Sequence, residues 1–333
     1  MFDIDSKIPR ITFRNLSQAL LASGLVAGCG TAQAQAPYPD RPVRLVVPYG
    51  PGGNADLQSR IIAQELGEAL AQSFVVDNRA GATGIIGADI VAKATPDGYT
   101  LLFIASPHAI NPSLVAKLPF DPVKDFAAIS LVGSTPLIIS VTPALPVKTI
   151  KELVALAKTK PGQLNYGSAR GGPGHLAGAL FNGVTGVSIV YVPYKITAQV
   201  LTDLMGNQIQ VAYPSATSVL PHLKAGRLRG LAITGQQRSA LAPELITAAE
   251  AGLPGYDASI WSGMIAPART PRPIIERLHA TLVTILKAPA VRKRFISLGA
   301  DPMTSTSAEF GAFVAAEIKK WGKVIKDSGI RTD

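Results

Sequence analysis

The chain has 333 residues and a formal net charge of +10 at pH 7. Hydrophobic residues make up 47% of it and charged residues 16%, a balance that excludes an intrinsically disordered protein. Because the length exceeds that of one typical domain, we expect two lobes that each bury a core of their own.

The first 36 residues have the pattern of an export signal. Three basic residues stand near the start, and the apolar stretch that follows, residues 16–28, is too short to span a bilayer. Small-x-small cleavage patterns occur twice between residues 32 and 36. We therefore predict that residues 1–36 are a signal peptide and that the mature protein is periplasmic.

The only cysteine, Cys29, leaves an alternative route of export open. It ends a Val-Ala-Gly-Cys sequence that resembles a bacterial lipoprotein box, in which this cysteine would carry a lipid anchor. Simple secretion is favoured because two cleavage patterns follow at once. In either case no free cysteine is left for a disulfide, a thiolate nucleophile or a thiol metal site.

Beyond the signal, short β-branched apolar runs alternate with helical patterns. Strands are predicted at 45–47, 74–76, 99–105, 129–132, 137–141, 164–167, 189–192, 209–213 and 228–234. Helices are predicted after 54, at 83–94, at 149–160, near 175–182, 197–205 and 217–225, and through most of 271–326. The helix at 149–160 begins with a predicted capping box formed by Thr149 and Glu152. This alternation predicts an α/β protein with mainly parallel sheets, whose ligands bind outside the carboxyl ends of the strands.

A glycine-rich loop at residues 48–56 is the most informative segment. It reads Pro-Tyr-Gly-Pro-Gly-Gly-Asn-Ala-Asp and stands between a predicted strand and a predicted helix. Unpaired amide groups and the positive end of the helix dipole meet at such a turn, which suits an anion. Because the loop lacks the Lys-Ser/Thr pair of a phosphate loop, a small carboxylate fits it as well as a nucleotide does.

Three further strand-to-helix loops have a similar composition, at 78–84, 105–108 and 167–175. Glycine and small residues let the backbone approach a ligand closely, and three of the four loops also offer hydroxyl groups. Each charge-assisted hydrogen bond to a carboxylate contributes roughly 1.5–3 kcal/mol. A few amide and hydroxyl donors in these loops are therefore enough to bind a carboxylate without a buried arginine.

Signals for an enzyme, a metal or a cofactor are weak. The sequence has no His-Glu-x-x-His, no Gly-x-Ser-x-Gly and no cysteine pair, and its four histidines (His108, His175, His222 and His279) lack metal-ligand spacing. We therefore expect no catalytic residues, no metal and no cofactor. Basic residues are scattered, so nucleic acid is not expected as a partner either.

Two enzyme alternatives remain open. The spacing Gly50-x-Gly52-x-x-Ala55, with Asp77 at the end of the next strand, partly matches an NAD-binding Rossmann unit. An exported, hydrolase-like enzyme is the other alternative, although no nucleophile–base pair supports it.

Several motifs together resemble a known family. They are Val-Pro-Tyr-Gly-Pro-Gly-Gly-Asn-Ala-Asp at 47–56, Val-Asp-Asn-Arg-Ala-Gly-Ala at 76–82, Pro-Asp-Gly-Tyr-Thr-Leu-Leu at 96–102, His-Leu-Ala-Gly at 175–178, Val-Pro-Tyr-Lys at 192–195, and Glu-Ala-Gly-Leu-Pro-Gly at 250–255. In this order they are similar to the Bug (Bordetella uptake gene) proteins, the solute receptors of tripartite tricarboxylate transporters. The resemblance extends from residue 38 to residue 330.

The resemblance implies a two-lobed periplasmic-binding-protein fold of the type II kind. Lobe one would comprise 37–137 plus 260–333 and lobe two 138–259, with crossing strands at 137–141 and 260–266 as the hinge. A monomer would capture a small carboxylate, or a related small polar acid, between the lobes and close around it. It would deliver that ligand to a membrane permease of the transporter or to a sensor.

The resemblance also implies a set of ligand-binding residues, mapped by motif position onto the four loops and the segment after 192. They are Tyr49, Gly52, Gly53, Asp56, Ala82, Thr83, Ser106, His108, Ser168, Gly172, Tyr194 and Lys195.

Two departures from the family pattern bear on the ligand. Ile196 stands where glycine normally follows Tyr-Lys, and Pro214 stands where many members have an aspartate that binds a ligand ammonium. Because a buried ammonium would lack its counter-charge here, we expect a carboxylate without an amine, carrying an apolar or aromatic portion.

Overall fold

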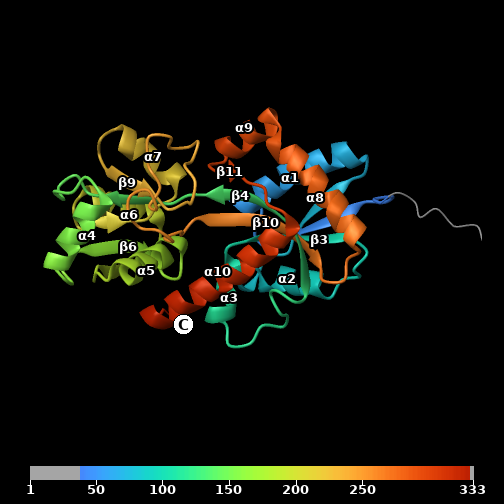
Figure 1. The fold of residues 1–333 in the computed structure, drawn as a ribbon, viewed down its shortest axis with the longest axis horizontal. Helices are drawn as coiled ribbons and strands as arrows, with labels where there is room; N and C mark the ends of the chain where they lie inside the picture. Colours follow the sequence, from blue (N-terminus) through green and yellow to red (C-terminus); the bar gives the residue numbers. More distant parts are fainter. Residues whose placement is uncertain (1–37, 331–333) are drawn as a thin grey trace, which may run out of the picture. The chain divides into compact units, whose positions relative to one another are not determined.

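The computed structural model describes residues 38–330, and the predicted signal peptide with Cys29 lies outside them. Two sheets, each with helices packed around it, make up the described chain (Figure 1). Within residues 38–330, no helix has both the length and the apolar character needed to cross a membrane.

The first sheet has six strands in the order β11-β4-β10-β3-β1-β2. They are β1 (Val43–Val47), β2 (Phe74–Asn78), β3 (Thr100–Ala105), β4 (Phe126–Thr135), β10 (Ile260–Pro267) and β11 (Asp301–Pro302). β1 pairs in parallel with β2 and β3, whereas β10 is antiparallel to β3 and β4. The sheet is therefore mixed, and its parallel part carries the first three predicted loops at the carboxyl ends of its strands.

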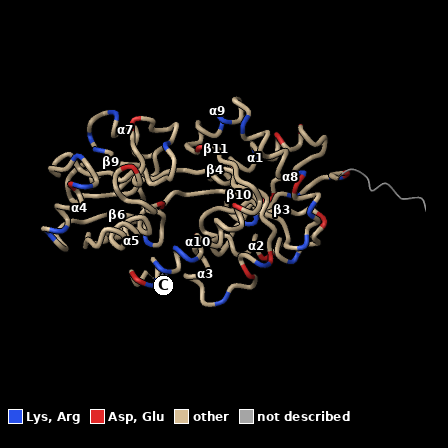
Figure 2. The backbone as a smooth tube through the Cα atoms, viewed as in Figure 1, with Lys and Arg blue, Asp and Glu red and all other residues tan. Residues whose placement is uncertain are grey.

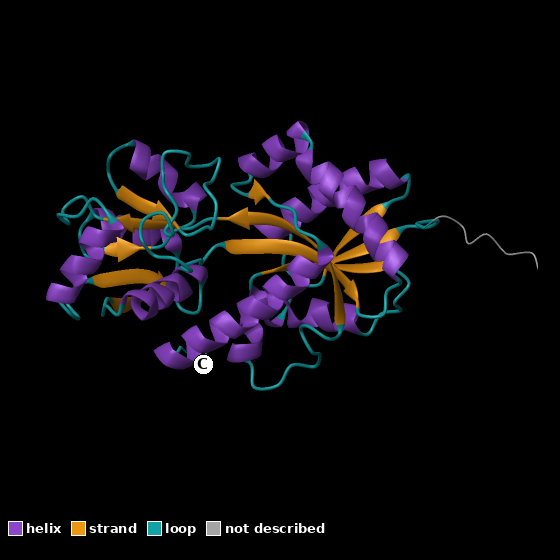
Figure 3. Ribbon diagram, viewed as in Figure 1, coloured by secondary structure: helices purple, strands orange, loops and turns teal. Residues whose placement is uncertain are grey.

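The second sheet has five strands in the order β7-β6-β8-β5-β9. They are β5 (Ile138–Val141), β6 (Asn165–Ala169), β7 (Val190–Tyr194), β8 (Val211–Ala212) and β9 (Arg229–Ile233). β6 pairs in parallel with β7 and β8, and β5 is antiparallel to β8 and β9. A parallel group beside antiparallel strands recurs in both sheets (Figure 3).

The chain passes between the sheets twice. β4 ends at Thr135 in the first sheet and β5 begins at Ile138 in the second, and the return leads into β10 at Ile260. Ile260 pairs with Thr135, so the two passages run side by side. The strand predicted at 129–132 is longer in the structure because β4 pairs with β10 along one edge and with β11 along the other.

Helices cover both sheets. Around the first sheet are α1 (Asn54–Leu70), α2 (Ile85–Ala92), α3 (Pro107–Leu114), α8 (Arg272–Lys287), α9 (Pro289–Ser297) and α10 (Ser307–Ser328), and around the second are α4 (Ile150–Thr159), α5 (Pro173–Thr185), α6 (Thr197–Met205) and α7 (Ala216–Lys224). The N-cap half of the capping box predicted for α4 is present, since the Thr149 hydroxyl accepts a hydrogen bond from the Glu152 amide. The Glu152 carboxylate accepts the Lys148 amide, and not the Thr149 amide that a full capping box would use. The loop at 105–108 was expected to lead into a helix, but the extent of α3 was not predicted, because Pro112 lies inside it and proline normally interrupts a helix.

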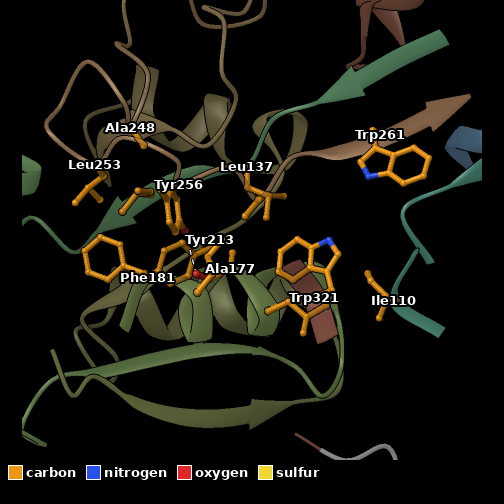
Figure 4. Packing of buried hydrophobic residues seen from close by; sticks show 14 of the residues in the cluster. Ile110, Leu137, Ala177, Phe181, Tyr213, Ala248, Leu253, Tyr256, Trp261 and Trp321 are labelled. Atoms are coloured by element: carbon orange, nitrogen blue, oxygen red, sulfur yellow. Dashed lines mark hydrogen bonds between the residues drawn. The ribbon is translucent and has the colours of Figure 1, made fainter. Parts of the chain in front are cut away.

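α10 links the two parts of the described chain. It packs on α3 and β4 beside the first sheet and on α5 beside the second. The Glu317 carboxylate of α10, 5% exposed, accepts the indole N–H groups of Trp261 and Trp321, each at 2.9 Å. Figure 4 shows Trp321 between Trp261 and the aromatic side chains around Tyr213, all within one hydrophobic cluster. A buried carboxylate with these partners holds α10 against the returning strand β10.

Candidate ligand-binding site

The first loop has the geometry that an anion site needs. β1 is buried and ends at Val47, whereas residues 50–54 are exposed and lead directly into α1. Gly52 adopts a φ of +80°, a conformation that glycine reaches without steric cost. Gly53 is the N-cap of α1 and offers no side chain, so no capping side chain occupies the first amide groups of this helix.

Asp56 sits behind this loop and organises it. Its carboxylate is 1% exposed and accepts hydrogen bonds from the Gly52 amide (2.9 Å), the Asn78 side chain (2.9 Å) and Arg60 (3.0 Å). Burial acts to raise the pKa of the Asp56 carboxyl, but these hydrogen bonds outweigh it and the pKa lies below its usual value. The carboxylate is thus ionised and fully occupied, and it supports the loop instead of facing a ligand.

Tyr49 joins three of the predicted loops. Its backbone oxygen accepts a hydrogen bond from the Asn78 side chain at 3.1 Å, and its hydroxyl accepts one from the Ala105 amide at 3.3 Å. Its ring lies against Gly84, where an added Cβ would come within 3.3 Å of it. Tyr49 therefore fixes the first loop against the second and the third, and burial raises the pKa of its hydroxyl above the ordinary value.

The second loop is held in a strained conformation. All four residues from 81 to 84 have positive φ, including 46° for Ala82 and 53° for Thr83, which is costly for a β-branched residue. Asn111 of α3 holds this loop: its side chain accepts the Thr83 hydroxyl at 3.0 Å and donates to the Thr83 backbone oxygen at 3.1 Å. These left-handed residues also explain why α2 begins at Ile85 and not at the predicted residue 83.

The two residues predicted in the third loop point elsewhere. Ser106 exchanges hydrogen bonds with Trp261 of β10 through its amide and its hydroxyl. His108 is 6% exposed, packs between Phe120 and Phe126, and shares a hydrogen bond of 3.0 Å with the Pro122 carbonyl. Burial lowers the pKa of His108 to about 4, so the imidazole is neutral at pH 7. The structure does not bring either side chain to the surface of the loops.

The fourth loop faces a small cavity beside the second sheet. Ser168 and Gly172 line it, together with Thr197 at the start of α6 and Ser215 before α7, and its volume is about 180 Å³. Gly174 makes room for the Ser168 hydroxyl, which would lie 2.8 Å from an added Cβ. The cavity thus brings the Ser168 hydroxyl at the end of β6 together with the hydroxyls of Thr197 and Ser215 at the starts of two helices, where donors to an anion are favoured.

The segment after β7 divides into a supporting and an exposed part. The Tyr194 hydroxyl donates to Asp203 at 2.7 Å, and burial and this carboxylate raise its pKa to about 12. Lys195 is exposed and makes no hydrogen bond to the described residues. Ile196 follows with 61% of its surface exposed. Tyr194 therefore stabilises the lobe, while the two residues after it remain open to a ligand.

Four of the residues that build these loops were missed by the sequence analysis: Asn78, Asn111, Thr197 and Ser215. Ser215 carries a readable signal, because serine directly before a helix is a preferred N-cap. Asn78 lies within the motif at 76–82, but that motif does not show its role, and Asn111 carries no signal, since its partner Thr83 lies 28 residues away. Among residues 38–330 no group of three or more acidic, histidine or cysteine side chains is arranged to hold a metal ion.

Comparison with known proteins identifies related chains over nearly the whole length. The family model of the tripartite tricarboxylate transporter family receptors, TctC, matches residues 58–330. Protein BugT of Bordetella pertussis is 35% identical over 323 residues, which cover 95% of this chain and 99% of that protein.

Two solved structures of related proteins have a similar fold, and one of them contains a bound ligand. Rpa4515 of R. palustris with adipate is 37% identical, covers 88% of this chain and 99% of its own, and has a TM-score of 0.67. A TctC solute-binding protein from Polaromonas, solved with no ligand, is only 28% identical but has a TM-score of 0.80. The match covers 87% of this chain and 99% of that protein. The described structure is thus closer to the ligand-free relative than to the adipate complex.

Proposed function

We propose that this chain, which belongs to the TctC family of tripartite tricarboxylate transporter receptors, binds a small carboxylate between two lobes and hands it to a membrane partner. The family consists of solute-binding receptors and not of enzymes, so neither an exported hydrolase nor an NAD-dependent oxidoreductase describes it. The observation that carries the proposal is the exposed, glycine-capped start of α1 with its open amides.

The first loops supply the docking surface for the carboxylate. Open amides at Gly53 and the residues after it meet the positive end of the α1 dipole, and Asp56 holds the loop in place from behind. The exposed backbone of Ala82 and Thr83 lies next to this loop, because Tyr49 contacts Gly84. Within this set we assign ligand contact to the amides and to Thr83, and support to Asp56, Ser106 and His108.

The second-sheet loops complete the site on closure. We place the division of the lobes at 37–137 plus 260–333 and 138–259, in keeping with the two sheets. Ser168, Gly172 and Lys195 then approach the bound carboxylate from lobe two, together with Thr197 and Ser215. The higher TM-score to the ligand-free relative supports an open starting state, and ligand affinity for the closed state drives the change.

The ligand is a carboxylate without an amine. Pro214 lines the second-sheet cavity and offers no negative charge to an ammonium group. The exposed Ile196 side chain stands beside Lys195 and adds an apolar surface for a hydrocarbon chain. Adipate, which is bound in the R. palustris relative, is a carboxylate without an amine and has a hydrocarbon chain. A dicarboxylate of that kind is therefore the ligand that we propose for this receptor.

Membership of this receptor family also supports export of the protein and delivery of its ligand to a membrane partner. A receptor of this family works beside a transporter in the membrane, so we place the mature protein in the periplasm after removal of residues 1–36. Secretion as a free monomer is our choice over a lipid anchor at Cys29. A permease of the tripartite transporter is the proposed recipient, with a sensor as the alternative.

Isothermal titration calorimetry on protein stripped of copurified ligand tests the proposal. A panel of mono-, di- and tricarboxylates and aromatic acids is titrated alongside aspartate and glutamate. We expect at least one amine-free carboxylate to bind at micromolar concentration or tighter. Binding of amino acids alone would contradict the ligand class, and turnover of an ester would contradict the receptor function.

A further inference from the structure

A larger cavity lies between α5 and β7 on one side and the last turns of α10 on the other. Its volume is about 900 Å³, which falls within the range of small-molecule sites. It shares no lining residue with the 180 Å³ cavity at Ser168, and none of the twelve residues predicted to bind the carboxylate borders it. Its chemistry is therefore independent of the site described above.

Stacked aromatic rings form one wall of this cavity. The His175 and Tyr191 rings lie 3.7 Å apart between centroids and within 11° of parallel, and the Tyr166 ring is 5.5 Å from that of Tyr191. Apolar side chains form another part of the lining, including Val184, whose surface is 45% exposed. A flat or apolar molecular body would cover this surface and bury it from water.

His175 directs one hydrogen-bond donor into the cavity. Its Nδ1 accepts the Gly171 amide at 3.1 Å, so the neutral ring carries its proton on Nε2. The side chain is 6% exposed, and burial, with the charge of Arg170, lowers its pKa to about 4. Nε2 forms no hydrogen bond to residues 38–330. It is also not among the fully buried side-chain atoms of these residues that lack a hydrogen bond, so part of its surface is accessible. This donor therefore opens into the cavity that His175 lines.

Positive charge surrounds the same opening. Lysines recur along the last turns of α10, where Figure 2 shows them in blue. Of the cations that line the cavity, Lys320 is engaged by Glu317 and Lys323 by Asp327, whereas Arg170 is exposed and forms no ion pair with the described residues. Arg170 and the His175 donor together offer an anionic group two unoccupied hydrogen-bond partners.

We propose that this cavity is a second binding site, which takes an organic anion with an aromatic or otherwise apolar body. Arg170 and the Nε2–H of His175 bind the carboxylate, and the body packs beside the Tyr191 ring and Val184. Because α5 and α10 belong to different sheets, the bound molecule contacts both parts of the receptor. The site shares no lining residue with the cavity at Ser168, although Arg170 lies in the same loop as Ser168 and Gly172.

Calorimetry with 2-naphthoate as the probe tests this site on the mature receptor. Gly183 lines the cavity, and a Cβ added there meets no atom within 4 Å, so Gly183→Phe fills the cavity without a backbone clash. We expect this variant to lose one bound equivalent of 2-naphthoate, or at least about tenfold in its affinity. Arg170→Ala weakens the same binding event about tenfold, because it removes one charge-assisted hydrogen bond.

Matched controls separate the site from general effects. Ala155→Phe adds the same bulk to an exposed position of α4, and Arg269→Ala removes another exposed arginine, and both retain naphthoate binding. Adipate affinity and melting temperature remain unchanged in Gly183→Phe, since Gly183 lies outside the carboxylate site. The proposal is overturned if wild-type protein binds no 2-naphthoate at millimolar concentration, or if Gly183→Phe and Arg170→Ala bind it as the wild type does.

Discussion

The loops of the two sheets have similar compositions but different structures. Beside the first sheet, the buried side chains of Asp56 and Asn111 and the half-buried side chain of Asn78 find partners within the protein, and the loops they hold leave mainly backbone groups exposed. Beside the second sheet, the hydroxyls of Ser168 and Ser215 border an open cavity, and Ile196 is exposed. The glycine-rich pattern thus builds a preorganised surface in one place and an adaptable one in the other.

The difference assigns separate tasks to the two surfaces. On the proposed function, a fixed set of amides would bind a carboxylate at little cost in conformational entropy, since the ordering is completed on folding. Exposed side chains of differing size would instead set which hydrocarbon portion fits. Substitutions in the first region should therefore act on stability and on overall affinity, and substitutions in the second on selectivity.

The largest effect is expected at Asp56. Asp56→Ala removes the acceptor of the Gly52 N–H and of one of the two hydrogen bonds that the Asn78 side-chain amide donates, which should lower the free energy of unfolding by about 3 kcal/mol. Urea unfolding measures this change. Glu276→Ala removes the acid of an exposed Arg272 pair and should cost less than about 0.5 kcal/mol. Equal losses in the two variants would refute a supporting network behind the first loop.

The pH dependence of stability reports on His108. Its pKa is about 4 in the folded protein and near 6.5 in model peptides, so the unfolded chain binds a proton in this window and the native protein does not. Stability is then complete above pH 6.5 and falls as pH drops toward 4. We expect His108 to account for a loss of about 2 kcal/mol between pH 7 and pH 5.

His108→Gln removes a titrating group, so its free energy of unfolding should fall less steeply over that interval. Unfolding curves at pH 7 and pH 5 give the comparison. An unchanged slope in the variant would show that His108 is protonated in the native state, contrary to its packing between two phenylalanines.

Asn111 tests whether the strained second loop must be held for binding. Asn111→Ala removes both side-chain bonds to Thr83, and we expect a loss of about 1.5 kcal/mol in stability and about tenfold in carboxylate affinity. Asn182→Ala also removes two bonds to the backbone, at Ile189 beside the second sheet, and should destabilise similarly without weakening carboxylate binding. Calorimetry that shows the same affinity loss in both variants would contradict a specific role for the held loop.

The smallest effect on folding is expected at Ile196. Ile196→Gly leaves stability within about 0.5 kcal/mol, because the side chain is exposed and glycine is accepted at the N-cap of α6. Affinity for adipate should fall about threefold relative to a shorter dicarboxylate, since an apolar contact is lost. A selectivity ratio identical to that of the wild type would remove Ile196 from the ligand surface.

Local patterns predicted much of the fold and placed the loops. Apolar runs located most of the strands, although not β11, and Thr149 marked the start of α4 correctly as its N-cap. The partners within the loops were not predictable, because Asn111 reaches Thr83 only after α3 has folded against the second loop. His108 shows the same limit, since its position beside a loop in sequence does not reveal that its ring turns into the core.

The most direct test of the account is a crystal structure of the mature receptor grown with adipate or with the best ligand from the carboxylate panel. The account predicts one carboxylate within about 3 Å of the open amides at the start of α1 and next to residues 82–83, with the second-sheet loops closed over the ligand. A carboxylate bound instead by arginine side chains, with residues 50–56 free of contact, would contradict it.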